Sequence, residues 1–167
     1  MLFRSLVFAE AIEKGNAKTS FLTLMSGRLD DPIRDELLKA GIEDAVEVSK
    51  WGGIAVGRRV YDLVYRQKDF KKSFLLQASL RGPWHIDELV TDEEYTVFIT
   101  VFPDKAQEYD KVSRDIRPRI SEDIPAEMLR KLYKSKIFTQ AYEPNGLSTD
   151  DFDNYFPVAR SEERRVG

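Results

Sequence analysis

Helical and strand-like spacings of apolar residues alternate along the first part of the chain. Apolar residues recur at helical spacing over residues 6–14 and 30–41, which predicts two amphipathic helices. Residues 18–26 mix β-branched, aromatic and leucine side chains, and residues 45–51 alternate apolar with polar positions. Both of these segments are therefore predicted to be strands.

The helix predicted at 30–41 has the clearest end signals in the chain. Asp31 is placed to cap its first turn, and Pro32 suits the first helical position, where no N–H donor is needed. Gly41 can take the left-handed conformation that ends many helices, and Ile42 can close an apolar contact behind it. These signals predict both ends of the helix.

A β-hairpin is the predicted structure of the next region. The alternating residues of 59–67 and 73–80 predict its two strands, and residues 68–72 predict a charged tip. Residues 52–57 are rich in glycine but lack the lysine and hydroxyl of a phosphate-binding loop. They are interpreted as a flexible connection that leads into the hairpin.

Two segments echo each other in sequence: KTSFLTLMS at 18–26 and KKSFLLQAS at 71–79. A diverged duplication would give such a likeness, but two amphipathic strands also reach it by coincidence. We attribute the echo to coincidence.

The strongest strand signal falls in residues 94–102, which are β-branched, aromatic and apolar on both faces. Such a strand is expected at the centre of its sheet. Residues 104–116 and 125–138 carry apolar side chains at helical spacing and are predicted helices. Residues 139–159 are turn-like at first and then acidic and aromatic.

Helices mixed with strands that are mostly joined by hairpins indicate an α+β fold. We expect a mostly antiparallel sheet with helices packed on one face, around a ferredoxin-like core, in a single domain over residues 6–138. Residues 139–159 are expected to form an acidic-aromatic C-terminal arm. The ends at 1–5 and 160–167 resemble translated adapter sequence at the edges of assembled metagenomic contigs, so we expect both to be non-native.

Composition narrows the chemistry without identifying it. The chain has 167 residues, 26 Lys and Arg against 29 Asp and Glu, a net charge of −3, one histidine and no cysteine. Disulfides, thiol chemistry and metal sites that need two imidazoles are excluded, and a globally basic surface is disfavoured. No apolar run approaches the ~20 residues of a membrane span. We expect no metal, no cofactor, no membrane partner and a cytoplasmic location.

The single histidine, His85, is the most conspicuous candidate for catalysis. A general base needs a carboxylate to orient it and a nucleophile to deprotonate. Asp87 lies close in sequence, but no Ser or Thr stands in a recognisable nucleophile context. We interpret His85 as a packed or solvated residue and predict no catalytic residue.

The predicted basic hairpin is the most specific surface feature, because cations outnumber anions there and aromatic residues are interleaved. Cations neutralise phosphates while aromatic rings stack on unpaired bases, which is a common way to hold single-stranded nucleic acid. The tyrosines also share a strand face with leucine and can instead belong to the core. The candidate binding residues are Arg58, Arg59, Tyr61, Tyr65, Arg66, Lys68, Phe70, Lys71 and Lys72.

The C-terminal arm has the opposite charge and carries its own aromatic residues. It can dock on the basic hairpin of its own chain or of a neighbouring subunit, since arm exchange is a common route to assembly. The candidate arm residues are Tyr142, Asp150, Asp151, Phe152, Asp153, Tyr155 and Phe156.

These features favour a non-enzymatic binding or assembly protein, of the kind that viruses and other mobile elements encode. Self-association or another protein would supply the contact to the hairpin and the arm. The alternative is a single-stranded nucleic-acid-binding protein that uses residues 58–72 and loses affinity steeply with salt. A third alternative, an enzyme that works with carboxylates and Mg²⁺, requires carboxylates that converge in a pocket.

Overall fold

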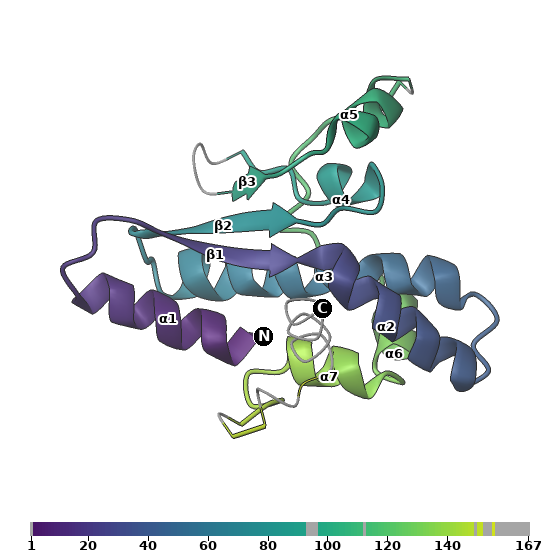
Figure 1. The fold of residues 1–167 in the computed structure, drawn as a ribbon, viewed down its shortest axis with the longest axis horizontal. Coiled ribbons are helices and arrows are strands. Elements are labelled where there is room, and N and C mark those ends of the chain that lie inside the picture. Colours follow the sequence, from purple (N-terminus) through teal and green to yellow (C-terminus); the bar gives the residue numbers. More distant parts are fainter. Residues whose placement is uncertain (1, 93–96, 112, 149, 152–154, 156–167) are drawn as a thin grey trace, which may run out of the picture.

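The computed structural model describes residues 2–92, 97–111, 113–148, 150–151 and 155. Eleven elements follow one another along this part of the chain (Figure 1). They are α1 (Leu2–Lys14), β1 (Ser20–Met25), α2 (Ser26–Lys39), α3 (Ala45–Tyr61), the π-helical turn η1 (Asp62–Gln67), β2 (Ser73–Ala78), α4 (Trp84–Asp87), β3 (Val97–Ile99), α5 (Pro103–Asp110), α6 (Ala126–Leu132) and α7 (Lys136–Tyr142).

The three strands form one sheet in the order β1–β2–β3, and both neighbouring pairs are parallel. The predicted mostly antiparallel sheet is therefore wrong, and so is the ferredoxin-like core. Parallel neighbours need a crossover connection rather than a hairpin. Helices α2 and α3 supply that crossover between β1 and β2 (Figure 1).

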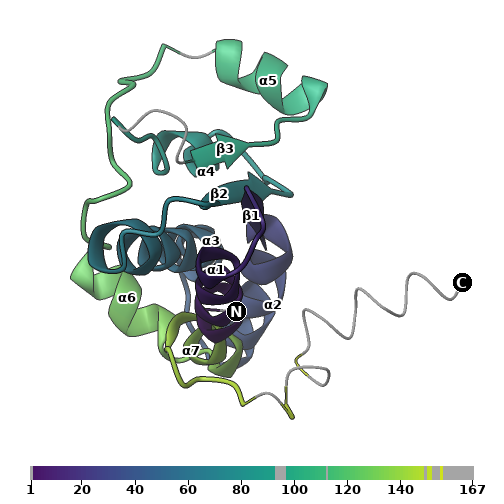
Figure 2. The same cartoon turned by 90° about the vertical axis from the view of Figure 1, so that its left-hand side faces the viewer.

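Helices cover one face of the sheet. Helices α1 and α3 lie against β1 and β2 on this face, and α2, α6 and α7 pack against α3 (Figure 2). The core forms here from apolar side chains such as Leu22, Leu75, Ile33, Val56 and Phe138. Within the described residues, no helix packs on the opposite face of the sheet. None of the described helices is both long and apolar enough to span a bilayer.

The middle of the chain is helical where a strand and a loop were expected. Helix α3 replaces the strand predicted at 45–51 and the flexible connection predicted at 52–57, and both predictions are wrong. A Cβ atom on Gly53 would lie 2.6 Å from the Cβ atom of Ser26 in α2. The glycines therefore allow the two helices to approach closely, which offsets the roughly 1 kcal/mol that glycine costs in a helix.

The predicted hairpin is also wrong. Residues 59–67 form the end of α3 and the turn η1, and the strand predicted at 73–80 is confirmed as β2. Val56, Val60 and Val64 are all buried and follow one another at i, i+4 spacing. The segment thus fits a helical period as well as a strand period, and burial between the sheet and the other helices selects the helix.

The first three predicted elements are confirmed as α1, β1 and α2, with one end of α2 displaced. The helix predicted at 30–41 begins at Ser26, so Pro32 lies inside it and Asp31 does not cap it. Gly41 has a φ angle of +74°, and the predicted left-handed helix end is confirmed.

The later elements are shorter than predicted. The strand predicted at 94–102 is described only as β3, and residues 93–96 lie outside the described residues. Strand β3 lies at the edge of the sheet, so the predicted central position is wrong. The helix predicted at 104–116 ends early as α5. The helix predicted at 125–138 is broken into α6 and α7. Ser135 lies between them and caps α7, because its hydroxyl accepts a hydrogen bond from the Phe138 N–H.

Candidate functional site

Three phenylalanine rings gather on the uncovered face of the sheet, one from each strand. The ring centroids of Phe21, Phe74 and Phe98 lie 5.8 Å (Phe21–Phe74), 5.3 Å (Phe21–Phe98) and 5.7 Å (Phe74–Phe98) apart. Phe21 is 48% exposed and Phe98 is 36% exposed. Successive side chains of a strand point to opposite faces, so Leu22 and Leu75 beside these rings point into the core. We call the surface around the three rings the aromatic face.

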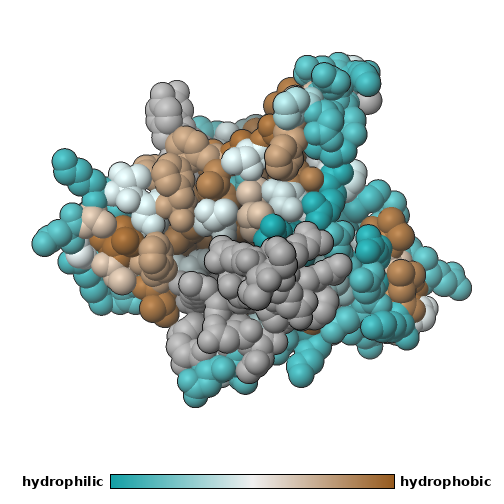
Figure 3. Space-filling view, in the orientation of Figure 1, coloured by the Kyte–Doolittle hydropathy of each residue, from teal (hydrophilic) through white to brown (hydrophobic). Residues whose placement is uncertain are grey.

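The aromatic face is uncharged as well as apolar. The spans of β1, β2 and β3 contain no acidic or basic residue. Thr23 and Leu76 share this face with the rings, and the exposed Val101 and Phe102 follow directly after β3. Figure 3 shows the result as a tan and white area that lies over the strands.

The open face is unusual because parallel sheets are normally covered on both faces. Two strands of six residues and one of three cover roughly 240 Å², from the usual strand spacing and rise. Covering this area with apolar groups is worth about 6 kcal/mol at ~25 cal/mol per Å², before the costs of association. The surface therefore offers a substantial driving force for docking.

Strand β1 is at one edge of the sheet, and within the described part of the chain it pairs only with β2. The Ser20 N–H donates to the Lys72 C=O at 2.8 Å, and the parallel register then assigns every second residue of β1 to the ladder with β2. The main-chain groups of Phe21 and Thr23 consequently point away from β2 and toward the free edge.

His85 lies in a polar network near the carboxyl ends of β1 and β2. Its Nε2 atom is 2.7 Å from Asp30 Oδ2, and its Nδ1 atom accepts the Arg81 N–H at 3.1 Å. Because Nδ1 is an acceptor, the ring proton is assigned to Nε2, which donates it to Asp30. The Gly53 N–H donates to Asp30 Oδ1 at 2.6 Å. Burial raises the pKa of Asp30, and the hydrogen bonds from His85 and Gly53 lower it in part.

This network is sealed from solvent. His85, Ser26 and Gln77 are fully buried, and the Ser26 hydroxyl donates to Gln77 Oε1 at 2.5 Å. Many α/β proteins bind ligands at the carboxyl ends of their strands. Here each polar side chain is enclosed, and the His85–Asp30 contact joins α2 to α4 while the Gly53 contact joins α2 to α3. The network therefore fixes the positions of three helices.

Arg58, the first residue of the predicted basic site, belongs to the core and is only 5% exposed. Its guanidinium donates to the Glu88 carboxylate at 2.6 Å and to the main-chain carbonyls of Glu88, Glu122 and Asp123. Burial lowers the pKa of Arg58, and the charge of Glu88 raises it back in part. Arg58 thus ties α3 to the segments that follow α4 and precede α6.

Both tyrosines of the predicted basic site pack with the core, in line with the core interpretation of this segment, although Tyr65 is only partly buried. Tyr61 is fully buried, and its ring centroid lies 5.1 Å from that of Tyr65. The Tyr65 hydroxyl donates to the Ser73 C=O at 2.5 Å, which ties η1 to the start of β2.

Arg59, Arg66 and Lys72 have partners within the chain. Arg59 and Arg66 each lie 3.7 Å from the Asp62 carboxylate. The Lys72 ammonium donates to the Glu13 C=O at 3.0 Å. The other predicted residues, in the turn before β2, are Lys68, Phe70 and Lys71. A binding role for these side chains stays a prediction. The hairpin that was expected to place them at the surface is absent, because residues 59–67 are helical.

Part of the arm does approach the basic segment. Tyr142 in α7 lines, together with Arg59 and Arg66, a cavity of about 180 Å³. Tyr155 is buried, and its hydroxyl donates to the Ile137 C=O at 3.0 Å. Asp150 and Asp151 are exposed, and Phe152, Asp153 and Phe156 lie outside the described residues.

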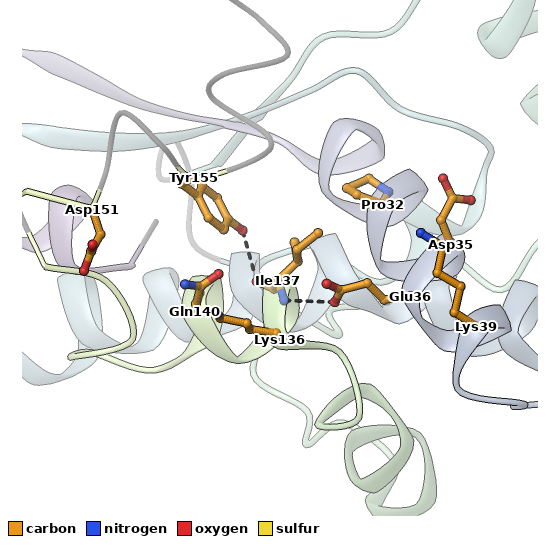
Figure 4. A pocket seen from close by; sticks show the side chains of 9 residues that line it. All are labelled: Pro32, Asp35, Glu36, Lys39, Lys136, Ile137, Gln140, Asp151 and Tyr155. Atoms are coloured by element: carbon orange, nitrogen blue, oxygen red, sulfur yellow. Dashed lines mark hydrogen bonds between the residues drawn. The ribbon is translucent and has the colours of Figure 1, made fainter.

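A larger cavity of about 550 Å³ lies between α2 and α7 (Figure 4). Its lining contains both acidic and basic side chains, and one of the acidic residues, Glu36, already accepts hydrogen bonds within the chain. Glu36 accepts hydrogen bonds from the Ser135 hydroxyl at 2.6 Å and from the Ile137 N–H at 3.1 Å. The cavity is lined by Pro32, Asp35, Glu36, Lys39, Lys136, Ile137, Gln140, Asp151 and Tyr155. Such mixed charge does not point to one class of ligand.

No sequence-based prediction assigned the aromatic face, although the sequence carries one signal of it. The echoing segments 18–26 and 71–79 are neighbours in the sheet, and the register aligns them in the same way as their sequences. Phe21 therefore lies directly beside Phe74. The echo reflects two adjacent strands with the same pattern of apolar side chains.

The described residues contain no group of three or more His, Asp or Glu side chains placed to hold a metal ion. Comparison of the chain with family models, with curated proteins and with solved structures gave no match.

Proposed function

We propose that this chain is a binding protein that docks another protein on its aromatic face. The observation that carries the proposal is the apolar face of a parallel sheet that no helix of the described residues covers, with Phe21, Phe74 and Phe98 in mutual contact. The proposal keeps the binding or assembly role expected from the sequence. It moves the main contact surface from the basic segment to the sheet.

A nucleic-acid partner fits this surface less well. Phenylalanine rings can stack on unpaired bases, but affinity for nucleic acid depends on cations beside the phosphates. The strands that carry the rings contain no Lys or Arg. At the start of β2, Lys71 is paired with Asp69, and Lys72 donates to the carbonyls of Glu13 and Gly15.

Site-specific photocrosslinking tests the proposal. A benzoylphenylalanine is placed at position 21 in one variant and at position 8 in a second, because Phe21 is 48% exposed and Phe8 is 49% exposed. Phe8 lies in α1, outside the aromatic face, and serves as the matched control. The variants are irradiated in a lysate, and the adducts are identified by mass spectrometry with and without nuclease treatment.

The proposal predicts nuclease-resistant protein adducts at position 21 in clear excess over position 8. Equal adducts at the two positions would overturn it. Adducts at position 21 that nuclease removes would favour the nucleic-acid alternative instead.

A further inference from the structure

We infer that the occupant of the aromatic face is an amphipathic helix of a partner protein, about 14 residues long. The inference rests on the proposed docking function, and it adds the shape and the chemistry of the segment that docks. It follows from the size of the face, from its lack of charge and from the way the opposite face is covered.

The size of the face favours a helix over a second copy of this chain. The three strands present roughly 240 Å², whereas a stable dimer interface needs about 800 Å² from each partner. A helix with its side chains is about 10–12 Å wide, and about 14 residues are about 20 Å long. One such helix matches the length of β1 and covers most of the width of the sheet.

The covered face of the same sheet shows how a helix fits these strands. Helix α3 packs on β1 and β2, and its Val56 and Val60 join Leu22 and Leu75 in the core. Parallel sheets usually receive a helical layer on each face. A helix from a partner would supply the second layer.

The chemistry of the face defines the side of the helix that contacts it. A charged side chain pressed against the uncharged strands would lose its hydration without gaining a partner. The docking stripe should therefore consist of apolar residues at i, i+3, i+4 and i+7 spacing. Because the contact is apolar, its affinity should change little with salt.

An extended segment paired with the free edge of β1 is the main rival occupant. The outward main-chain groups of Phe21 and Thr23 would bind such a strand. That arrangement would leave Phe74 and Phe98 uncovered, however, whereas a helix across the strands covers all three rings. The helix therefore accounts for more of the exposed apolar surface.

Fluorescence anisotropy with two labelled peptides tests the inference. One peptide, about 14 residues long, carries leucines at helical spacing among Glu and Lys; the other has the same composition in strand-like alternation. Each is titrated with the wild type, Phe21→Glu, Phe98→Glu and the matched control Phe8→Glu. A further variant, Thr23→Pro, removes an N–H that faces the free edge. Circular dichroism confirms the fold of every variant.

The helical peptide is expected to bind the wild type and Phe8→Glu alike, and to bind Phe21→Glu and Phe98→Glu at least about tenfold more weakly. Preferential binding of the alternating peptide, lost in Thr23→Pro, would overturn the inference in favour of a strand. Sedimentation that shows a dimer lost in Phe21→Glu would overturn it in favour of a second copy.

Binding of the helical peptide that does not depend on Phe21, or no binding at all, also overturns the inference. The position-21 crosslink decides separately whether the docking function stands, because it does not depend on the shape of the partner. The two failures are therefore distinguishable.

Discussion

The two faces of β2 differ both in their side chains and in their surroundings. Leu75 is fully buried beneath the helices, whereas its neighbours Phe74 and Leu76 are only partly buried on the aromatic face. The covered face also holds the polar Ser73 and Gln77, whereas the open face holds only Phe74, Leu76 and Ala78. The open face of this strand is therefore the more apolar of the two, as expected for a sheet surface that is covered. The comparison shows that a strand face can be apolar although no described element of this chain packs on it. The aromatic face has the pattern of a core without the second layer.

The largest expected effect comes from shortening one leucine on each face. Leu75→Ala should lower the free energy of unfolding by about 2–5 kcal/mol, because it leaves a cavity in a packed core. Leu76→Ala, the matched change on the open face, should cost less than about 1.5 kcal/mol because solvent fills the space. Urea unfolding measures both values. Equal losses would contradict the claim that only one face is covered.

The sealed network around His85 gives the next largest effect. Asp30→Asn should cost about 1–3 kcal/mol, since an amide cannot accept hydrogen bonds from both Gly53 N–H and His85 Nε2–H. The free energy of unfolding measured in denaturant checks this value. A variant as stable as the wild type would show that the network does not fix the helices.

The same pair predicts a dependence of stability on pH. Burial raises the pKa of Asp30 above the unfolded value of about 3.9. The folded chain therefore holds this proton more tightly, and the resulting stabilisation is complete below about pH 3.9 and is lost as the pH rises through the raised pKa. The wild type should lose stability relative to Asp30→Asn over this range. Denaturant titrations of both proteins from about pH 3 to about pH 8 test the sign; a constant difference would contradict it.

The smallest effect on stability should come from the aromatic face itself. Phe21→Glu should change the free energy of unfolding by no more than about 1 kcal/mol, because the ring is 48% exposed and at the sheet edge. Phe8→Glu should behave similarly in thermal unfolding. A much larger loss in Phe21→Glu would mean that Phe21 supports the fold rather than a contact with a partner.

The period of the apolar residues predicted several elements correctly, and the failures have identifiable physical causes. The glycines of α3 suggested a loop because their role, close contact with Ser26 in α2, is visible only in three dimensions. Residues 59–67 fit two periods at once, so local pattern could not select between a strand and a helix.

The candidate sites depended even more on contacts between distant residues. Asp30 and His85 lie 55 positions apart, and no local spacing reveals that they meet. The parallel pairing of the strands is equally non-local. The aromatic face was nonetheless signalled by the echo between 18–26 and 71–79, which became interpretable once the register was known.

The most direct test of the aromatic face is the rate of hydroxyl-radical oxidation at Phe21 and Phe98. It is measured in the free chain and again with the partner that the position-21 crosslink retrieves, with Phe8 as the exposed reference and Phe138 as the buried one. The account predicts rapid oxidation of both rings in the free chain and protection in the complex, with Phe8 reactive in both states. Rings as unreactive as Phe138 in the free chain, or unprotected rings in the complex, would contradict it.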